Sequence, residues 1–224
     1  MYYIAKNPKN AEVYQKMIKI CKYFFVKNPI LVISNLHYYQ NGWGTRKNDG
    51  WNSIDMNRIS AKLWITDRLP VYRQHVSNNS LVSSIIPKIY QCDAKYLILC
   101  DQVISLNELI FLCSSAEALD FKRVTVKNGT VLAFEKFFEQ LPQIKVIYYT
   151  FSTPSNNTTK NTFKDTWKIS HLSNSFHFYL FNIPQNFDID IFYSYMKYCL
   201  FFGFNNDSHI LSRHIKYFLE KQKC

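Results

Sequence analysis

Glycine is scarce in this sequence, with only 5 among 224 residues. Dinucleotide-binding loops of the Rossmann type need three glycines in the pattern Gly-x-Gly-x-x-Gly, because their backbone must approach a pyrophosphate closely. Gly42 and Gly44 have the first spacing, but Lys47 occupies the position of the third glycine. The sequence therefore argues against a dinucleotide-binding domain.

The sequence also lacks the cysteine patterns of metal sites and disulfide scaffolds. Its 6 cysteines include no Cys-x-x-Cys pair, and their spacing fits neither a zinc motif nor a compact disulfide framework. No apolar run reaches the ~20 residues of a membrane-spanning helix, and the first residues show no signal-peptide core. We therefore expect a cytoplasmic or nuclear protein with reduced thiols, no membrane segment and no metal or other cofactor.

Aromatic residues and positive charge are abundant instead. Aromatic residues make up 17% of the chain, and the net charge is +11. Aromatic-rich sequences favour strand-rich layers and broad contact surfaces. A diffuse positive charge favours acidic partners or weak phosphate contact without specifying either. Because no basic run is longer than the pairs Arg46-Lys47 and Lys122-Arg123, we favour a basic surface over a nucleic-acid site.

The first 60 residues contain three predicted segments. Apolar residues recur at helical spacing over 13–25, and Asn28-Pro29 ends the predicted helix. An apolar, β-prone run follows at 30–36. The polar stretch at 41–57 holds three of the 5 glycines and predicts a loop.

A strand-then-helix unit recurs from about residue 59. Strands are predicted at 62–66, 96–99, 118–121, 144–151 and 176–181, and helices at 81–90, 105–114 and 132–141. Ser105 and Glu108 form a capping box at the second of these helices. The leading apolar positions Leu97, Leu119 and Ile144 lie 22 and 25 residues apart, within the roughly 20–29 residues of leucine-rich-type repeats. Such units bury one face only by stacking on their neighbours.

One candidate catalytic pair is present. Asp188 and Asp190 have the Asp-x-Asp spacing with which some glycosyltransferases hold a divalent metal and a nucleotide diphosphate. The pair also stands where a helix is predicted to begin, and carboxylates there stabilise the free amides and the helix dipole. We expect no enzymatic activity, with a metal-dependent, glycosyltransferase-like enzyme as an alternative.

Nucleic-acid binding is the other alternative. Basic and aromatic residues are interleaved around Lys145, Tyr148 and Tyr149, as in proteins that stack single-stranded bases. A strand with alternately buried and exposed residues has the same pattern, and we favour the strand.

One resemblance to a known family covers nearly the whole chain. In residues 3–30, the run Cys21-Lys-Tyr-Phe24 above all resembles the second half of an F-box. The rest, most closely at 62–67, 85–93, 109–115, 124–128 and 182–190, resembles the leucine-rich-like region attached to F-boxes in the expanded nematode F-box families. The Leu-Pro pair and helix that usually open an F-box are missing. We therefore expect a truncated F-box at 1–30 and a leucine-rich-repeat-like region at 31–224.

The resemblance implies a non-enzymatic substrate-recognition subunit of a Skp–cullin–F-box ubiquitin ligase. Its F-box would dock on a Skp-type adaptor, and its repeats would hold an unidentified target protein. Binding would raise the target's effective concentration near the ubiquitin-carrying partner. The expected fold is α/β: a short leucine-rich-repeat-like strand–helix solenoid preceded by a helical F-box remnant.

Period-two alternation along the strands predicts which residues meet the target. If Leu97, Leu119 and Val146 point into the core, their neighbours face the opposite side of the sheet. The concave sheet face of a solenoid commonly binds partners. The predicted protein-binding residues are therefore Ile98, Asp120, Lys122, Lys145, Ile147 and Tyr149.

Overall fold

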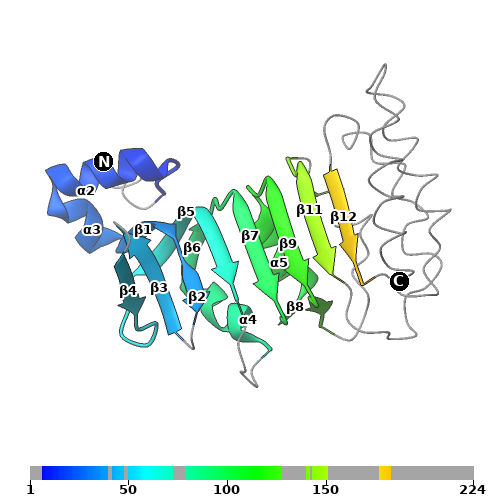
Figure 1. Ribbon diagram of the computed structural model, residues 1–224. Helices are drawn as coiled ribbons and strands as arrows, with labels where there is room; N and C mark the ends of the chain where they lie inside the picture. Colours follow the sequence, from blue (N-terminus) through cyan, green and yellow to red (C-terminus); the bar gives the residue numbers. More distant parts are fainter. Residues whose placement is uncertain are drawn as a thin grey trace, which may run out of the picture.

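A computed structural model shows a mixed α/β protein built around a large, mostly parallel sheet (Figure 1). The structure describes residues 7–39, 42–47, 50–72, 79–127, 140–141, 143–150 and 177–182. The predicted helix at 132–141 lies almost entirely outside the described residues.

Twelve strands and four α-helices are described. The strands are β1 (Ile30–Asn35), β2 (His37–Tyr39), β3 (Gly42–Lys47), β4 (Gly50–Ile54), β5 (Lys62–Val71), β6 (Ile89–Cys92), β7 (Tyr96–Cys100), β8 (Val103–Ile104), β9 (Ala118–Lys122), β10 (Thr125–Val126), β11 (Val146–Thr150) and β12 (His177–Phe181). The helices are α2 (Ala11–Ile20), α3 (Lys22–Lys27), α4 (Leu81–Ile85) and α5 (Leu106–Cys113), and a 3₁₀ turn covers Ile86–Lys88.

Parallel neighbours dominate the sheet. Strands β2, β5, β7, β9, β11 and β12 lie side by side in chain order, and each is parallel to the next. β1 and β6 pair with the first half of β5, also in parallel. The β3–β4 hairpin adds antiparallel strands beside β2. Because parallel neighbours require crossover connections, the chain must leave the sheet and return between them.

The polar segment at 41–57, predicted as a loop, contains this hairpin. The prediction was wrong because a short strand at the side of a sheet needs little apolar alternation when much of it is exposed. The hairpin also explains why position 44 is a glycine. A Cβ atom there would lie 2.4 Å from the Trp51 ring and 2.7 Å from the carbonyl oxygen of Asn52. The glycine therefore lets the indole lie against the β3 backbone.

The predicted N-terminal helix is present but divided. The backbone at Cys21 is extended and separates α2 from α3. Tyr14, the buried residue of α2, packs with Ile30 and Trp64. Its hydroxyl donates a hydrogen bond of 2.5 Å to the carbonyl oxygen of Asn28. These contacts attach the helical segment to the start of β1 and β5.

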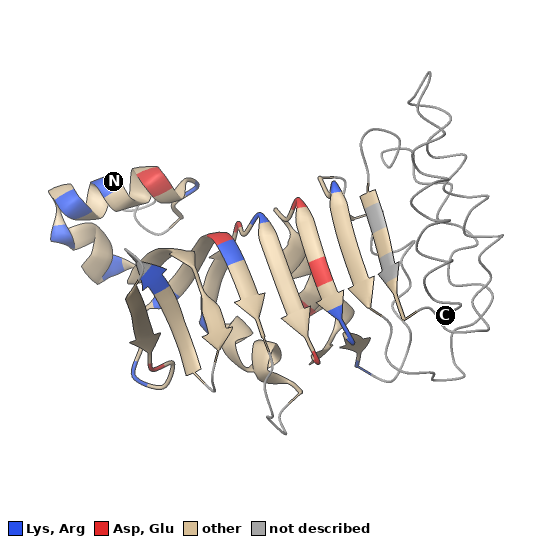
Figure 2. Ribbon diagram, in the orientation of Figure 1, with Lys and Arg blue, Asp and Glu red and all other residues tan. Residues whose placement is uncertain are grey.

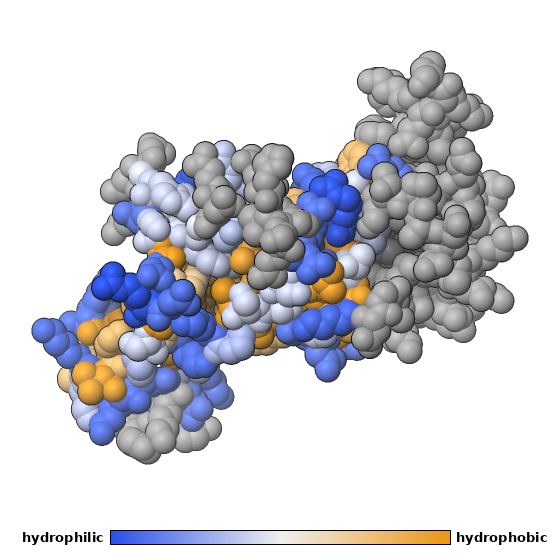
Figure 3. Space-filling view, turned by 90° about the horizontal axis from the view of Figure 1, so that it is seen from below, coloured by the Kyte–Doolittle hydropathy of each residue, from blue (hydrophilic) through white to orange (hydrophobic). Residues whose placement is uncertain are grey.

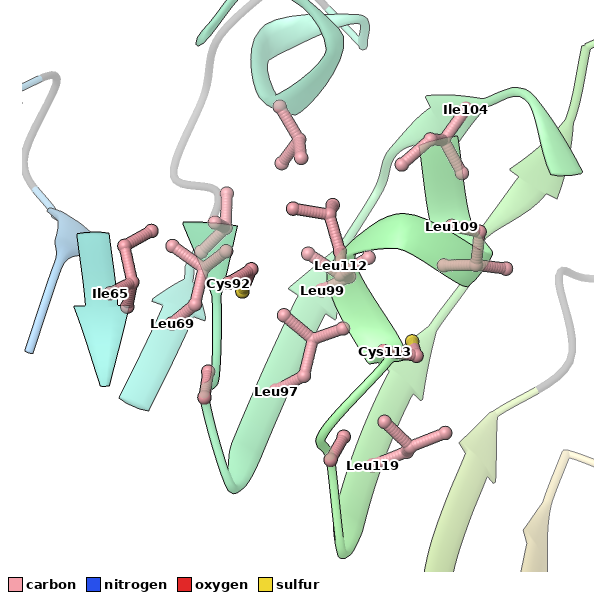
Figure 4. Packing of buried hydrophobic residues seen from close by; sticks show 14 of the residues in the cluster. Ile65, Leu69, Cys92, Leu97, Leu99, Ile104, Leu109, Leu112, Cys113 and Leu119 are labelled. Carbon is pink, nitrogen blue, oxygen red and sulfur yellow. The ribbon is translucent and has the colours of Figure 1, made fainter. Parts of the chain in front are cut away.

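Helix α5 covers one side of the sheet. Leu109 and Leu112 of this helix and Leu97, Leu99 and Leu119 of β7 and β9 are all fully buried and belong to one cluster (Figure 4). Burying a leucine side chain of this size is worth about 2 kcal/mol. The α5–sheet contact is therefore a major source of stability.

The capping box predicted at the start of α5 is confirmed. The Glu108 amide donates to Ser105 Oγ at 3.3 Å, and the Ser105 amide donates to Glu108 Oε2 at 2.8 Å. The two bonds satisfy amides that the helix itself leaves without partners. Burial opposes ionisation, but bonds from Ser105, Lys127 and Ser83 lower the pKa of Glu108 to about 2.

The alternation predicted for β11 was wrong. Ile147 lies opposite Leu119, and Tyr149 lies opposite Phe121. Ile147 and Tyr149 are 0% and 6% exposed, so they belong to the core rather than to a binding surface. The prediction aligned Ile144 with Leu119, three residues too early, and an odd shift exchanges the two faces of a strand.

The chain bends sharply after three of the parallel strands. Asp101, Arg123 and Asn182 follow β7, β9 and β12 and have φ of 54°, 54° and 52°, a left-handed conformation that is uncommon outside glycine. The Arg123 guanidinium donates two hydrogen bonds, of 2.6 and 2.7 Å, to the Asp101 carboxylate. This bidentate pair ties one bend to the next.

Candidate functional site

The side of the sheet away from α5 carries the candidate site. We call this side the open face; its residues alternate with the buried ones along the parallel strands. Strand register places Pro70, Ile98, Asp120, Tyr148 and Tyr179 in one row across β5, β7, β9, β11 and β12. Helix α2 contacts this side of the sheet at the first half of β5, through Tyr14 and Trp64.

Tyrosines are prominent on the open face. Tyr148 and Tyr179 stack across β11 and β12, with ring centroids 4.7 Å apart and planes inclined by 8°. Tyr96 is 48% exposed and Tyr148 is 39% exposed. The Arg68 guanidinium carbon lies 4.9 Å from the centroid of the Tyr96 ring, so a cation–π contact orients both side chains.

An ion pair lies beside these rings. Asp120 Oδ2 and Lys122 Nζ are 3.1 Å apart. Although partial burial acts in the other direction, the Asp120 carboxylate raises the pKa of Lys122. Asp120 Oδ1 is buried without a hydrogen-bond partner. The carboxylate of Asp120 thus keeps acceptor capacity that the described part of the chain does not use.

The predicted binding residues are divided among three environments. Ile98, Asp120 and Lys122 lie on the open face, whereas Ile147 and Tyr149 lie in the core. Lys145 precedes β11 at the edge of the sheet, where its Nζ lies 2.6 Å from Glu117 Oε2. Glu117 Oε1 also lies 3.2 Å from Lys95 Nζ.

Tyr148 was missed by the sequence interpretation. It lies opposite Asp120 and is exposed, so it takes the place assigned to its two neighbours. The signal was ambiguous because Val146, Ile147, Tyr148 and Tyr149 are four consecutive apolar or aromatic residues. In such a run, period-two alternation fits either phase.

Charged residues lie mainly near the ends of the strands, and the middle of the open face is largely uncharged apart from Asp120 (Figure 2). Figure 3 views the molecule from below, at the carboxyl ends of the parallel strands and not onto the open face. On this side, hydrophobic residues reach the surface in small separate patches between hydrophilic ones.

A second group of side chains lies on the same side of β2, β3, β4 and β5. We call it the basic–aromatic cluster; it consists of His37, Tyr39, Arg46, Trp51 and Arg68. The Trp51 ring centroid lies 6.3 Å from that of His37 and 6.5 Å from that of Tyr39, both edge to face. Burial, followed by the positive charges of Arg46 and Arg68, lowers the pKa of His37. Sequence reasoning missed this cluster because the hairpin that completes it was interpreted as a loop.

The helical segment carries a third surface. Val13, Ile20, Tyr23 and Val26 are exposed on α2 and α3, and Ile20 is 84% exposed. Lysines surround them (Figure 2). An apolar set on helices whose buried side already contacts the sheet is a candidate docking surface.

The glycosyltransferase-like alternative would require a site for a divalent metal ion. Within the described residues, no group of three or more His, Cys, Asp or Glu side chains could hold a metal ion. Asp188 and Asp190 lie outside the described residues. No helix in the described ranges is long and apolar enough to cross a membrane.

Comparison of the chain with protein-family models, with curated proteins and with solved structures found no match. The interpretation of function therefore rests on the geometry of the three surfaces.

Proposed function

We propose that this chain is a non-enzymatic protein-interaction module whose open face captures a target protein. The observation that carries the proposal is the exposure of Tyr96 and Tyr148 beside Asp120 on a surface formed by adjacent strands. Tyrosine is enriched at binding hot spots because it offers a large, rigid contact area and a hydroxyl at a low entropic cost. Because neighbouring strands fix the positions of the two tyrosines, little conformational entropy is lost when a partner binds.

We further propose that the strands belong to a short leucine-rich-repeat-like solenoid. Two units support this: β7 with β8, and β9 with β10. The second unit repeats the first after 22 residues, since Leu119 pairs with Leu97 and Thr125 pairs with Val103. Unlike a single doubly wound domain, such units can be added one after another along a continuous sheet.

A buried glutamine supports the same architecture. Gln102 is 1% exposed and lies between β7 and β8. Its side-chain oxygen accepts a hydrogen bond from the Val82 amide at 3.1 Å, and its amide nitrogen donates to the Cys100 carbonyl at 3.1 Å. The side chain therefore satisfies a carbonyl at the end of β7 and an amide in the first turn of α4, and so joins the bend to that helix.

The helical segment completes the proposed role. The exposed apolar residues of α2 and α3, including Ile20 and Tyr23, would dock a Skp-type adaptor, and the open face would hold the target. The protein would then act as the substrate-recognition subunit of a Skp–cullin–F-box ubiquitin ligase in the cytoplasm or nucleus. It would catalyse no reaction itself but would raise the effective concentration of the target near the ubiquitin-carrying partner.

A protein target is favoured over nucleic acid by the charge at the centre of the open face. Asp120 lies between Ile98 and Tyr148 across the strands, and a carboxylate there repels phosphate groups. A nucleic-acid platform would present basic residues along this row.

Affinity purification from native cells tests the proposal with two double variants. Tyr96→Ser/Tyr148→Ser should lose the target and keep the adaptor, whereas Tyr23→Ser/Val26→Ser should lose the adaptor and keep the target. Thermal unfolding of each purified variant checks that the fold is retained. If the open-face variant keeps every partner of the wild-type protein, the proposed role of this face is wrong.

A further inference from the structure

The basic–aromatic cluster brings together two arginines and a histidine from three adjacent strands. His37 lies on β2, Arg46 on β3 and Arg68 on β5. Strand pairing explains their proximity: His37 lies opposite Gly44, two residues before Arg46, and the Leu36 amide beside His37 donates to the Arg68 carbonyl at 3.0 Å. These residues are distant in sequence, so their convergence is a product of the fold.

Each arginine has an aromatic residue as its neighbour on an adjacent strand. Trp51 lies directly opposite Arg46 in the β3–β4 hairpin, and its indole covers Gly44, where a side chain would collide with it. On the other side, the Tyr96 ring holds the Arg68 guanidinium at 4.9 Å. The Tyr96 ring limits the positions open to the Arg68 guanidinium, which reduces the entropy lost when Arg68 binds a ligand.

The two arginines have spare hydrogen-bonding capacity. Arg46 is exposed and forms no ion pair within the described ranges. Arg68 has one loose pair, 3.5 Å from Nε to Asp67 Oδ2, in which both side chains are largely exposed. A guanidinium presents five donors in a planar fork that matches a carboxylate. Within the described residues, the positive charge of the cluster is therefore opposed only by the loose pair of Arg68 with Asp67, and most of its guanidinium donors are available to a ligand.

We propose that the basic–aromatic cluster binds an acidic segment of the target protein, with aspartate or glutamate carboxylates held by Arg46 and Arg68 and flanked by Trp51. The inference rests on the proposed function and adds to it the chemistry of the partner. Charge complementarity selects an anionic partner, and the protein target proposed above makes that partner an acidic segment. The segment would cross β2 and β5 and continue toward Tyr96 on the same side of the sheet.

Isothermal titration of the full-length protein with a hexaglutamate peptide tests the proposal, and a hexaglutamine peptide serves as the neutral reference. Arg46→Gln and Arg68→Gln should each weaken hexaglutamate binding roughly tenfold, the loss expected for one charge-assisted contact. Arg58→Gln removes the same charge from the exposed turn between β4 and β5 and should leave the affinity nearly unchanged. Hexaglutamine should not bind.

Three results would overturn the inference. The first is the absence of hexaglutamate binding at low ionic strength. The second is an equal loss of affinity in all three arginine variants, which would indicate a diffuse charge effect. The third is tighter, Arg46-dependent binding of oligothymidylate, which would assign the cluster to nucleic acid. Cellular partners that are lost from Tyr96→Ser/Tyr148→Ser but kept by the arginine variants would leave the proposed function intact and contradict only the acidic segment.

Discussion

Ile147 of β11 lies directly opposite Leu119 of β9, and both side chains are fully buried. Tyr148, the next residue along β11, points to the other side of the sheet and is 39% exposed. This one-residue difference decides which side chains of β11 a partner can reach, because successive residues of a strand face opposite sides.

Substitutions on the two faces of β11 should therefore differ in how much they destabilise the protein. Ile147→Ala should lower the free energy of unfolding by about 3 kcal/mol, because it removes buried methyl groups and leaves a cavity. Tyr148→Ala should cost less than about 1 kcal/mol, mainly the lost stacking on Tyr179. Urea denaturation measures both. Equal costs at the two positions would contradict the register.

The β3–β4 hairpin offers a matched pair of glycines. An alanine Cβ at Gly44 would meet the Trp51 ring at 2.4 Å, whereas nothing lies within 4 Å of one at Gly42. Gly44→Ala should destabilise the protein by about 1–3 kcal/mol as the indole is displaced. Gly42→Ala should change the free energy of unfolding by no more than about 0.5 kcal/mol. The same denaturation experiment distinguishes them, and a neutral Gly44→Ala would show that the indole does not need this glycine.

Glu108 should make stability depend on acid pH. The hydrogen bonds described above outweigh burial and lower the pKa of Glu108 from 4.5 to about 2 in the folded protein. A lowered folded-state pKa stabilises the protein above pH ~4.5, and this contribution is lost as the pH falls from about 4.5 to about 2. The fall in the pKa of Glu108 from 4.5 to about 2 corresponds to at most about 3–4 kcal/mol.

Comparison of the wild-type protein with Glu108→Gln isolates this effect, because the glutamine side chain cannot ionise and all other carboxylates are common to both proteins. The difference in free energy of unfolding should be largest at neutral pH and should shrink below pH ~4.5. If this difference stays constant down to pH ~2, the charge of the Glu108 carboxylate adds nothing to the stability that the capping box provides.

The cysteines should differ strongly in reactivity. Cys21 is exposed, whereas Cys92 and Cys113 are buried. Burial raises the pKa of the Cys92 thiol to about 11 and raises the pKa of Cys113 as well, and only the thiolate is nucleophilic. Iodoacetamide should therefore alkylate Cys21 more than about tenfold faster than the other two. Peptide mass spectrometry of the native protein measures each rate, and similar rates would contradict the burial of α5 against the sheet.

Local signals were sufficient to predict several elements. The α5 helix follows from a capping box four residues long and an apolar stripe, both of which are encoded within one segment. The strand at β7 was also predicted, because residues 96–99 form a short continuous apolar run, which is typical of a buried parallel strand. Such features need no information about distant residues.

The open face could not be predicted fully, because its composition depends on pairing between distant segments. The register between β9 and β11 is set by the length of the connection between them, and the distance from Leu119 to Ile147 is 28 residues rather than the 22 of the preceding repeat. The basic–aromatic cluster likewise requires the β3–β4 hairpin, whose polar sequence gives little strand signal.

The most direct test of the account is site-specific photo-cross-linking in native cells. A photoreactive phenylalanine analogue at Tyr148 reports on the open face, and the same analogue at Asn107, an exposed residue of α5, reports on the opposite side. If the open face captures a protein, a discrete protein should be cross-linked from position 148 and not from position 107. Equal cross-linking from both positions, or none from 148, would contradict the proposal that the open face captures a protein.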